Sequence, residues 1–119
     1  MNATKILIVD DDFAVRNVLK DILSSDGYIV VTVENGSQAY EQFRLYTFDI
    51  VLLDINMPKM NGVETVKAIR ERNPHVPIII ISGYNDADTI SEAIEGGADD
   101  FIRKPCTPEI LLEKCARYR

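Results

Sequence analysis

The sequence has little histidine, little cysteine and no long apolar run, and each shortage excludes a class of protein. It contains one histidine and two cysteines in 119 residues. Cys106 and Cys115 fit neither a Cys-x-x-Cys pair nor a zinc-ligand spacing, so we expect two small thiols that fill the core. His75 lies between two prolines in an expected loop, so it is interpreted as a solvated surface residue without a role.

Basic residues are outnumbered as well, with thirteen Lys and Arg against nineteen Asp and Glu and a net charge of −6. Because contacts to nucleic-acid phosphates need clustered Lys or Arg, this balance argues against nucleic-acid binding by this domain. No apolar run approaches the roughly 20 residues that cross a bilayer. The apolar residues 6–9 are too few for a signal peptide and run into acids. We therefore expect a cytoplasmic protein that does not bind membranes.

The composition is that of an ordinary globular domain, with 46% hydrophobic and 27% charged residues. The length is near the commonest domain size, and we see no repeat, low-complexity segment or linker. We expect one domain over residues 1–119. Whether it stands alone or is cut from a longer regulator or hybrid kinase stays open.

Apolar runs and amphipathic segments alternate five times along the chain. The runs predict strands at residues 5–9, 28–33, 48–53, 76–81 and 100–103. The segments after them predict helices at residues 13–23 and 37–46, from Asn61 to Asn73, from Asn85 or Asp86 to Gly96, and from Thr107. The first helix is expected to bury Ala14, Val15, Val18, Leu19 and Ile22, the second Ala39, Tyr40 and Phe43, and the fourth Ile90, Ala93 and Ile94.

This alternation predicts an α/β fold. Helical crossovers make the strands parallel and place helices on both faces of the sheet. The first, third and fourth strands are the most apolar, so they are expected at the centre, with the second and fifth at the edges. The strand order 2-1-3-4-5 satisfies this arrangement and is that of the flavodoxin-like doubly wound (βα)5 fold.

Polar side chains follow four of the five strands. Asp10 and Asp11 follow the first strand, Asp54 the third, Ser82 the fourth and Lys104 the fifth. Because the carboxyl ends of parallel strands lie along one edge, the fold gathers all five residues there. Taken singly, each has an ordinary explanation as a helix cap, a turn former or a surface charge. Their arrival at one edge favours a shared site.

These residue types are suited to phosphoryl chemistry. Crowded carboxylates repel one another unless a cation binds, and oxygen ligands at a partly hydrated site suit Mg²⁺. A carboxylate can attack phosphorus and form an aspartyl phosphate, a step that depends mainly on positioning and charge neutralisation. Lys104 and the metal would neutralise the phosphoryl oxygens, and Ser82 would donate a hydrogen bond to one of them.

Four motifs in order also carry a resemblance to a known family. They are Ile-Leu-Ile-Val-Asp10-Asp11-Asp12, Leu-Leu-Asp54-Ile-Asn-Met-Pro58 with Gly62 following, Ile-Ser82-Gly and Lys104-Pro105. Together they resemble the receiver domain of two-component response regulators over nearly the whole chain. The resemblance implies a phosphoacceptor switch, a phosphoprotein of phosphorelay signalling. Such a domain is not an enzyme, although it assists its own phosphorylation and dephosphorylation.

The resemblance implies a role for each matching residue. Asp54 is the implied phosphoacceptor. Asp11 and Asp54 would bind Mg²⁺ directly, Asp10 through water and Asn56 through its backbone carbonyl, and Mn²⁺ could substitute.

The remaining residues match family positions that take part in the conformational switch. Ser82 and Lys104 would bind the phosphoryl group, and Phe101 would turn inward when the Ser82 hydroxyl moves. The family also expects a cis Lys104-Pro105 bond. Ser82, Phe101 and Cys106 differ from the commonest family residues at their positions.

Partners follow from the same resemblance. A sensor histidine kinase or phosphotransfer protein would donate the phosphoryl group. The surface of the fourth helix, fifth strand and fifth helix would contact an output domain or protein, and a homodimer is also open.

Three other functions fit these residues less well. A Mg²⁺-dependent phosphatase with an aspartyl-phosphate intermediate needs a second acid beside its nucleophile, and Asn56 is not an acid. A non-phosphorylated module of the same fold typically lacks one acidic or lysine position, and none is missing here. An FMN protein would need a Ser/Thr/Gly-rich loop after the first strand, where three aspartates stand instead.

Overall fold

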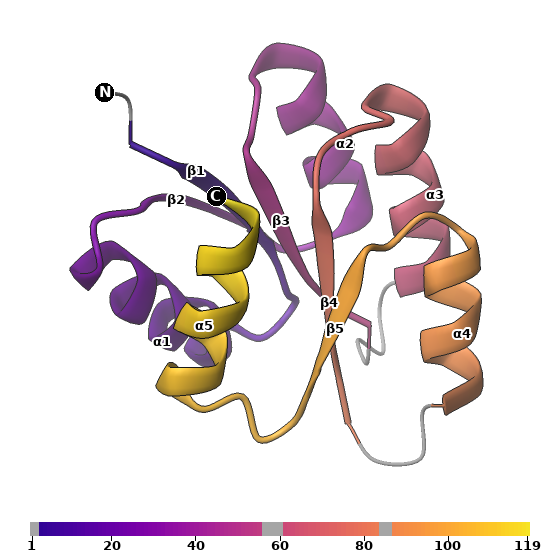
Figure 1. Cartoon of the computed structure of the whole chain (residues 1–119). Coiled ribbons are helices and arrows are strands. Elements are labelled where there is room, and N and C mark those ends of the chain that lie inside the picture. Colours follow the sequence, from indigo (N-terminus) through magenta and orange to yellow (C-terminus); the bar gives the residue numbers. More distant parts are fainter. Residues whose placement is uncertain (1–2, 56–60, 84–86) are drawn as a thin grey trace.

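Strands and helices alternate along the chain (Figure 1), five of each in the part that the structure describes. The structure is a computed structural model that describes residues 3–55, 61–83 and 87–119. Its elements are β1 (Lys5–Val9), α1 (Phe13–Ser25), β2 (Ile29–Val33), α2 (Gly36–Leu45), β3 (Ile50–Asp54), α3 (Gly62–Arg72), β4 (Ile78–Ser82), α4 (Ala87–Glu95), β5 (Asp100–Arg103) and α5 (Pro108–Tyr118). Within these residues, no helix has the length and apolar character that crossing a membrane requires.

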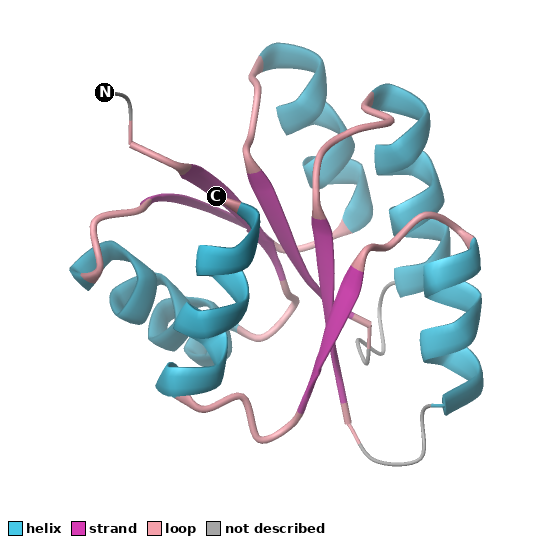
Figure 2. Cartoon of the chain, in the orientation of Figure 1, coloured by secondary structure: helices cyan, strands magenta, loops and turns pink. Residues whose placement is uncertain are grey.

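The strands form one parallel sheet in the order β2-β1-β3-β4-β5, which confirms the predicted fold and edge strands. Figure 2 shows α1 and α5 on one face of this sheet and α2, α3 and α4 on the other. In the ladder, Asp54 at the end of β3 lies beside Ile81 of β4, and Ser82 lies beside Arg103 of β5. The polar residues that end these strands therefore meet at one edge.

Alternate strand residues supply two separate cores. In β1, Leu7 and Val9 pack into the core under α2, α3 and α4, whereas Ile6 and Ile8 pack into the core under α1 and α5. Every residue of β3 and β4 is buried. Because burial on both faces demands an apolar run, these strands carry their polar groups only where the run ends.

Three strands begin later than the apolar pattern predicts. The strands expected at residues 28–33, 48–53 and 76–81 are observed at Ile29–Val33, Ile50–Asp54 and Ile78–Ser82. Phe48 and Val76 are buried before their strands begin, so core packing explains their apolar side chains. Asp54 and Ser82 are consequently the last residues of their strands. The expected start of the fourth helix, at Asn85 or Asp86, lies outside the described residues.

The helices bury narrower faces than their patterns predict. Ala14, Val18, Tyr40 and Ile94 were expected to be buried, but Ala14 is exposed and the other three are 57%, 39% and 40% exposed. Each lies at the margin of its helix's apolar stripe, where neighbouring residues already fill the core. The converse exception is Arg16, which is buried at 8% exposure although it is charged.

Local side chains fix where helices begin. In the described part of the chain, four N-cap side chains accept hydrogen bonds from backbone N–H groups of the first turn, namely Asp12, Asn35, Asn61 and Thr107. Glycine is required directly after one of these caps, because a Cβ at Gly62 would lie 2.7 Å from the Cα of Ile55. This close approach sets the start of α3 against the residue that follows Asp54.

Candidate functional site

Asp54 lies in the middle of the carboxyl edge of the sheet and is paired with Lys104. Asp54 ends β3 with its side chain 7% exposed, while the Lys104 side chain is 39% exposed. Lys104 Nζ donates a hydrogen bond to Asp54 Oδ2 at 2.9 Å. The Lys104 backbone N–H donates to the Ser82 carbonyl at 2.7 Å, and the Lys104-Pro105 bond is cis, as the resemblance implies. A buried carboxylate is therefore held by a cation that keeps access to solvent.

Asp10 lies beside Asp54, and one of its carboxylate oxygens accepts no hydrogen bond from the described residues. It is 1% exposed, and its Oδ1 accepts the Asp12 backbone N–H at 2.9 Å. Oδ2 is buried and has no hydrogen-bond partner within the described part of the chain. Burial raises the pKa of Asp10 to about 6, the Asp12 N–H opposes the rise, and the charge of Asp54 adds to it. The carboxylates of Asp10 and Asp54 therefore carry more negative charge than Lys104 neutralises.

The three neighbouring aspartates have different tasks. Asp12 caps α1 by accepting the N–H groups of Ala14 and Val15 at 2.9 and 3.2 Å, so the helix-cap explanation holds for this residue. Asp10 points to Asp54 instead, and Asp11 is partly exposed. Among residues 3–55, 61–83 and 87–119, no group of three or more His, Cys, Asp or Glu side chains is ready to hold a metal ion. Asn56, whose carbonyl was an expected ligand, lies outside the described residues.

Ser82 places a hydroxyl at the same edge. The residue is 0% exposed, and no partner for its Oγ is present among the described residues. A buried hydroxyl without a hydrogen bond costs free energy, so it is a strong candidate to bind a group that enters the site.

Phe101 lies further along the edge strand β5 with its ring 37% exposed. The guanidinium carbon of Arg103 is 5.9 Å from the centroid of this ring. Ile94 of α4 and Ile110 of α5 are 40% and 39% exposed. Among the described residues, α4, β5 and α5 thus each present one large apolar side chain to solvent.

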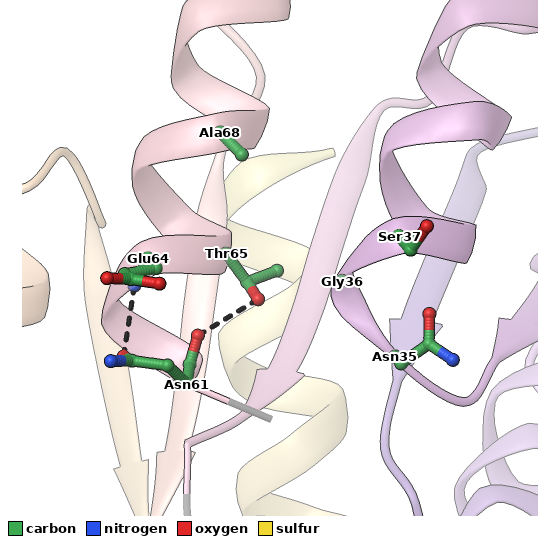
Figure 3. A pocket seen from close by; sticks show the side chains of 7 residues that line it. All are labelled: Asn35, Gly36, Ser37, Asn61, Glu64, Thr65 and Ala68. Carbon is green, nitrogen blue, oxygen red and sulfur yellow. Dashed lines mark hydrogen bonds between the residues drawn. The ribbon is translucent and has the colours of Figure 1, made fainter. Parts of the chain in front are cut away.

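A hollow of about 540 Å³ lies between the N-terminal ends of α2 and α3 (Figure 3). Helix N-termini attract anions through free N–H groups, and here each cap side chain occupies one N–H of its helix. Asn35 accepts from the Gln38 N–H at 2.8 Å, and Asn61 accepts from the Glu64 N–H at 3.2 Å. The Thr65 hydroxyl donates to the Asn61 carbonyl at 3.0 Å. We assign no ligand to this hollow.

The family follows from comparison with known proteins. The model of the response regulator receiver domain matches residues 6–116. The chain belongs to this family. The chemotaxis protein CheY of Thermotoga maritima is 41% identical over 110 residues, which are 92% of each chain. The crystal structure of the Vibrio cholerae chemotaxis protein CheY4 matches with a TM-score of 0.92 at 32% identity and covers 99% of this chain and 100% of that one.

Other relatives of this receiver are longer proteins. The transcriptional regulatory protein ZraR of Klebsiella oxytoca is 44% identical over 100 residues, which are 84% of this chain but 23% of ZraR. The structure of NtrX from Brucella abortus matches with a TM-score of 0.92 at 30% identity and covers 98% of this chain and 27% of NtrX. The chain therefore spans about a quarter of the length of these regulators.

One residue of the site was missed by reasoning from sequence. Arg16 NH1 donates a hydrogen bond of 2.7 Å to the Asp10 backbone carbonyl. A charged residue on a helix ordinarily faces solvent. Only the position of Arg16 next to the apolar stripe of α1 could have indicated that it is buried.

Proposed function

We propose that Asp54 accepts a phosphoryl group from the phosphohistidine of a sensor histidine kinase or phosphotransfer protein. One observation carries the proposal: a nearly buried carboxylate at the end of β3 is paired with Lys104 at 2.9 Å. A carboxylate oxygen of Asp54 attacks phosphorus and the phosphorus–nitrogen bond breaks. The leaving imidazole nitrogen keeps the electron pair and takes up a proton. Hydrolysis of the acyl phosphate later restores Asp54 and releases inorganic phosphate.

Two groups of the chain are assigned to the phosphoryl oxygens. Lys104 passes from the carboxylate to a phosphoryl oxygen as negative charge arrives there. The Ser82 hydroxyl donates a hydrogen bond to another oxygen, and this gives the buried donor the partner it lacks among the described residues. The domain thus assists its own phosphorylation and dephosphorylation by positioning, without being an enzyme for a separate substrate.

The acids at this edge fit a divalent cation. The buried Asp10 Oδ2 has no hydrogen-bond donor among the described residues, and the negative charge of Asp54 acts on the Asp10 carboxylate. Mg²⁺ is commonly held by one or two carboxylates and several waters, so a complete cluster of three acids is not required. We assign Asp11 and Asp54 as direct ligands, Asp10 as a ligand through water and the Asn56 carbonyl as a further ligand, with Mn²⁺ as a substitute. Bound Mg²⁺ supplies charge neutralisation for the phosphoryl oxygens.

The readout is assigned to the exposed apolar side chains of α4, β5 and α5. Phe101 turns inward when the Ser82 hydroxyl moves to the phosphoryl group, and this alters the surface formed with Ile94 and Ile110. An output domain or protein binds that surface, and a homodimer through it is a second outcome. We place the domain in the cytoplasm, where it would meet the kinase that phosphorylates it.

Replacement of the acceptor tests the proposal. Asp54→Asn keeps the shape of the side chain but removes the nucleophilic carboxylate. Incubated with a small acyl phosphate and Mg²⁺, the wild-type chain is expected to gain one phosphoryl group by intact-mass spectrometry, and Asp54→Asn to gain none. Asp21→Asn, on the exposed surface of α1, is the matched control and should behave as wild type. Full phosphorylation of Asp54→Asn would contradict the assignment of Asp54 as the phosphoacceptor.

A further inference from the structure

Arg16 is a charged residue that the structure buries at the base of the acidic site. It is 8% exposed, and its guanidinium carbon lies 5.6 Å from the ring centroid of Phe13. Its NH1 donates to the Asp10 carbonyl at 2.7 Å, and its NH2 lies 3.5 Å from the Glu34 carboxylate. An arginine is rarely buried unless its donors are used, so the contacts that it makes explain its position.

Asp10 is held at three of its four polar atoms. Its backbone N–H donates to the Val33 carbonyl at 3.1 Å, and its carbonyl accepts from Arg16. Its Oδ1 accepts the Asp12 N–H at 2.9 Å. Only Oδ2 is left over, buried and without a partner among the described residues. Two of the three contacts use backbone groups of other residues, whereas the bond to Arg16 is made by a side chain that a substitution can remove.

We infer that Arg16 is a positioning residue for the divalent-cation site, acting through the Asp10 carbonyl. That carbonyl belongs to the peptide that joins Asp10 to Asp11, so holding it restricts the directions of both side chains. Without this bond the carbonyl would have no partner among the described residues that restricts its direction, and the cation would have to order the peptide on binding. The inference rests on the proposed function, because it concerns the same metal site.

Removing the guanidinium tests the inference through metal affinity. Arg16→Met keeps most of the apolar stem and deletes the bond to Asp10. We expect the Mg²⁺ dissociation constant, measured by titration calorimetry, to rise about tenfold, which is typical for residues that orient metal ligands. Phosphorylation of Asp54 should slow at low Mg²⁺ and recover at saturating Mg²⁺.

Arg70→Met is the matched control for loss of a partly buried arginine whose donors are also used. The Arg70 side chain is 18% exposed, and its guanidinium binds Asp99 and the carbonyls of Gly97, Asn73 and Val76, which precede β4 and β5 at the opposite edge of the sheet. This variant is expected to lose stability but to keep the wild-type Mg²⁺ affinity. A purely structural effect of Arg16 would make the two variants behave alike.

A second control separates the two partners of Arg16. Glu34→Gln weakens the ion pair at 3.5 Å but leaves the bond to the Asp10 carbonyl, so Mg²⁺ affinity should stay at the wild-type value. If Arg16→Met does not fold by circular dichroism, Arg16→Lys is measured, which keeps a cationic donor and is expected to lose part of the affinity.

The outcomes distinguish the inference from the proposed function. Weaker Mg²⁺ binding in the Arg16 variant, with Arg70→Met and Glu34→Gln unchanged, supports the inference. Equal affinity in wild type and in every folded Arg16 variant overturns it and leaves the metal site intact. A wild-type chain that does not bind Mg²⁺ overturns both.

Discussion

Replacing Asp10 by asparagine is expected to stabilise the protein at pH 7 in EDTA. Asp10 is 1% exposed, and burial more than any other cause raises its pKa to about 6. Asparagine keeps an oxygen to accept the Asp12 N–H and removes the charge. Its amide can donate a hydrogen bond to the Asp54 carboxylate, which repels Asp10 in the wild type.

The magnitude follows from the shift of the Asp10 pKa. The ordinary pKa of the group is 3.8, against about 6 for Asp10 in the folded protein. Each tenfold change in proton affinity is worth about 1.4 kcal/mol, so holding Asp10 ionised at pH 7 costs the fold about 3 kcal/mol. Because burying the amide of asparagine offsets part of this gain, we expect a net stabilisation of about 1–2 kcal/mol.

Linkage fixes how the difference depends on pH. Because the folded-state pKa of Asp10 lies above the unfolded value, the folded protein binds more protons between pH 3.8 and about 6, and the Asp10 contribution to stability falls as pH rises through that window. The advantage of Asp10→Asn should be absent below that window and complete above it. Urea unfolding followed by far-UV circular dichroism at several pH values measures it. A variant less stable than wild type at pH 7, or a difference that does not change with pH, would refute the reasoning.

Three further substitutions have expected outcomes that urea unfolding measures. Gly62→Ala should destabilise the fold by about 1–3 kcal/mol, because its Cβ would lie 2.7 Å from the Ile55 Cα, and an unchanged midpoint would contradict that contact. Burial raises the pKa of Asp100, but hydrogen bonds from Lys114, the Phe101 N–H and Tyr118 outweigh it and hold the pKa below its usual range. Asp100→Asn should therefore lose stability at pH 7, and the loss should disappear as pH falls below 3.8; a loss of equal size at low pH would point to packing instead. Ser82→Ala removes a buried hydroxyl without a partner among the described residues, so it should be neutral or stabilising, and a loss above about 1 kcal/mol would show that the hydroxyl is bonded.

The sequence was sufficient to predict the sheet and the residues at its carboxyl edge. Parallel strands buried on both faces leave no place for a polar side chain except the strand ends, so Asp54 and Ser82 could be located from the apolar runs alone. The predicted strand order brought Lys104 to the same edge as Asp54, fifty positions earlier in the chain, and in the structure Lys104 Nζ lies 2.9 Å from Asp54 Oδ2.

Other features could be found only from the three-dimensional structure. Asp10, Asp11 and Asp12 are the same residue type in a row, and only the turn that begins α1 decides that Asp12 caps the helix while Asp10 faces Asp54. The burial of Arg16 depends on a backbone carbonyl six residues earlier, which has no signature in the residue types. The exposure of Val18 reflects how little of α1 the sheet covers, and helical periodicity does not give the width of a buried face.

Chemical mapping of the phosphorylated residue tests the central claim most directly. The wild-type chain is phosphorylated in the presence of Mg²⁺, the acyl phosphate is reduced with borohydride, and the modified residue is located by peptide mass spectrometry. We expect the reduced residue to be Asp54 alone. Reduction at Asp10 or Asp11, or a phosphoryl group that survives at a hydroxyl or imidazole, would contradict it.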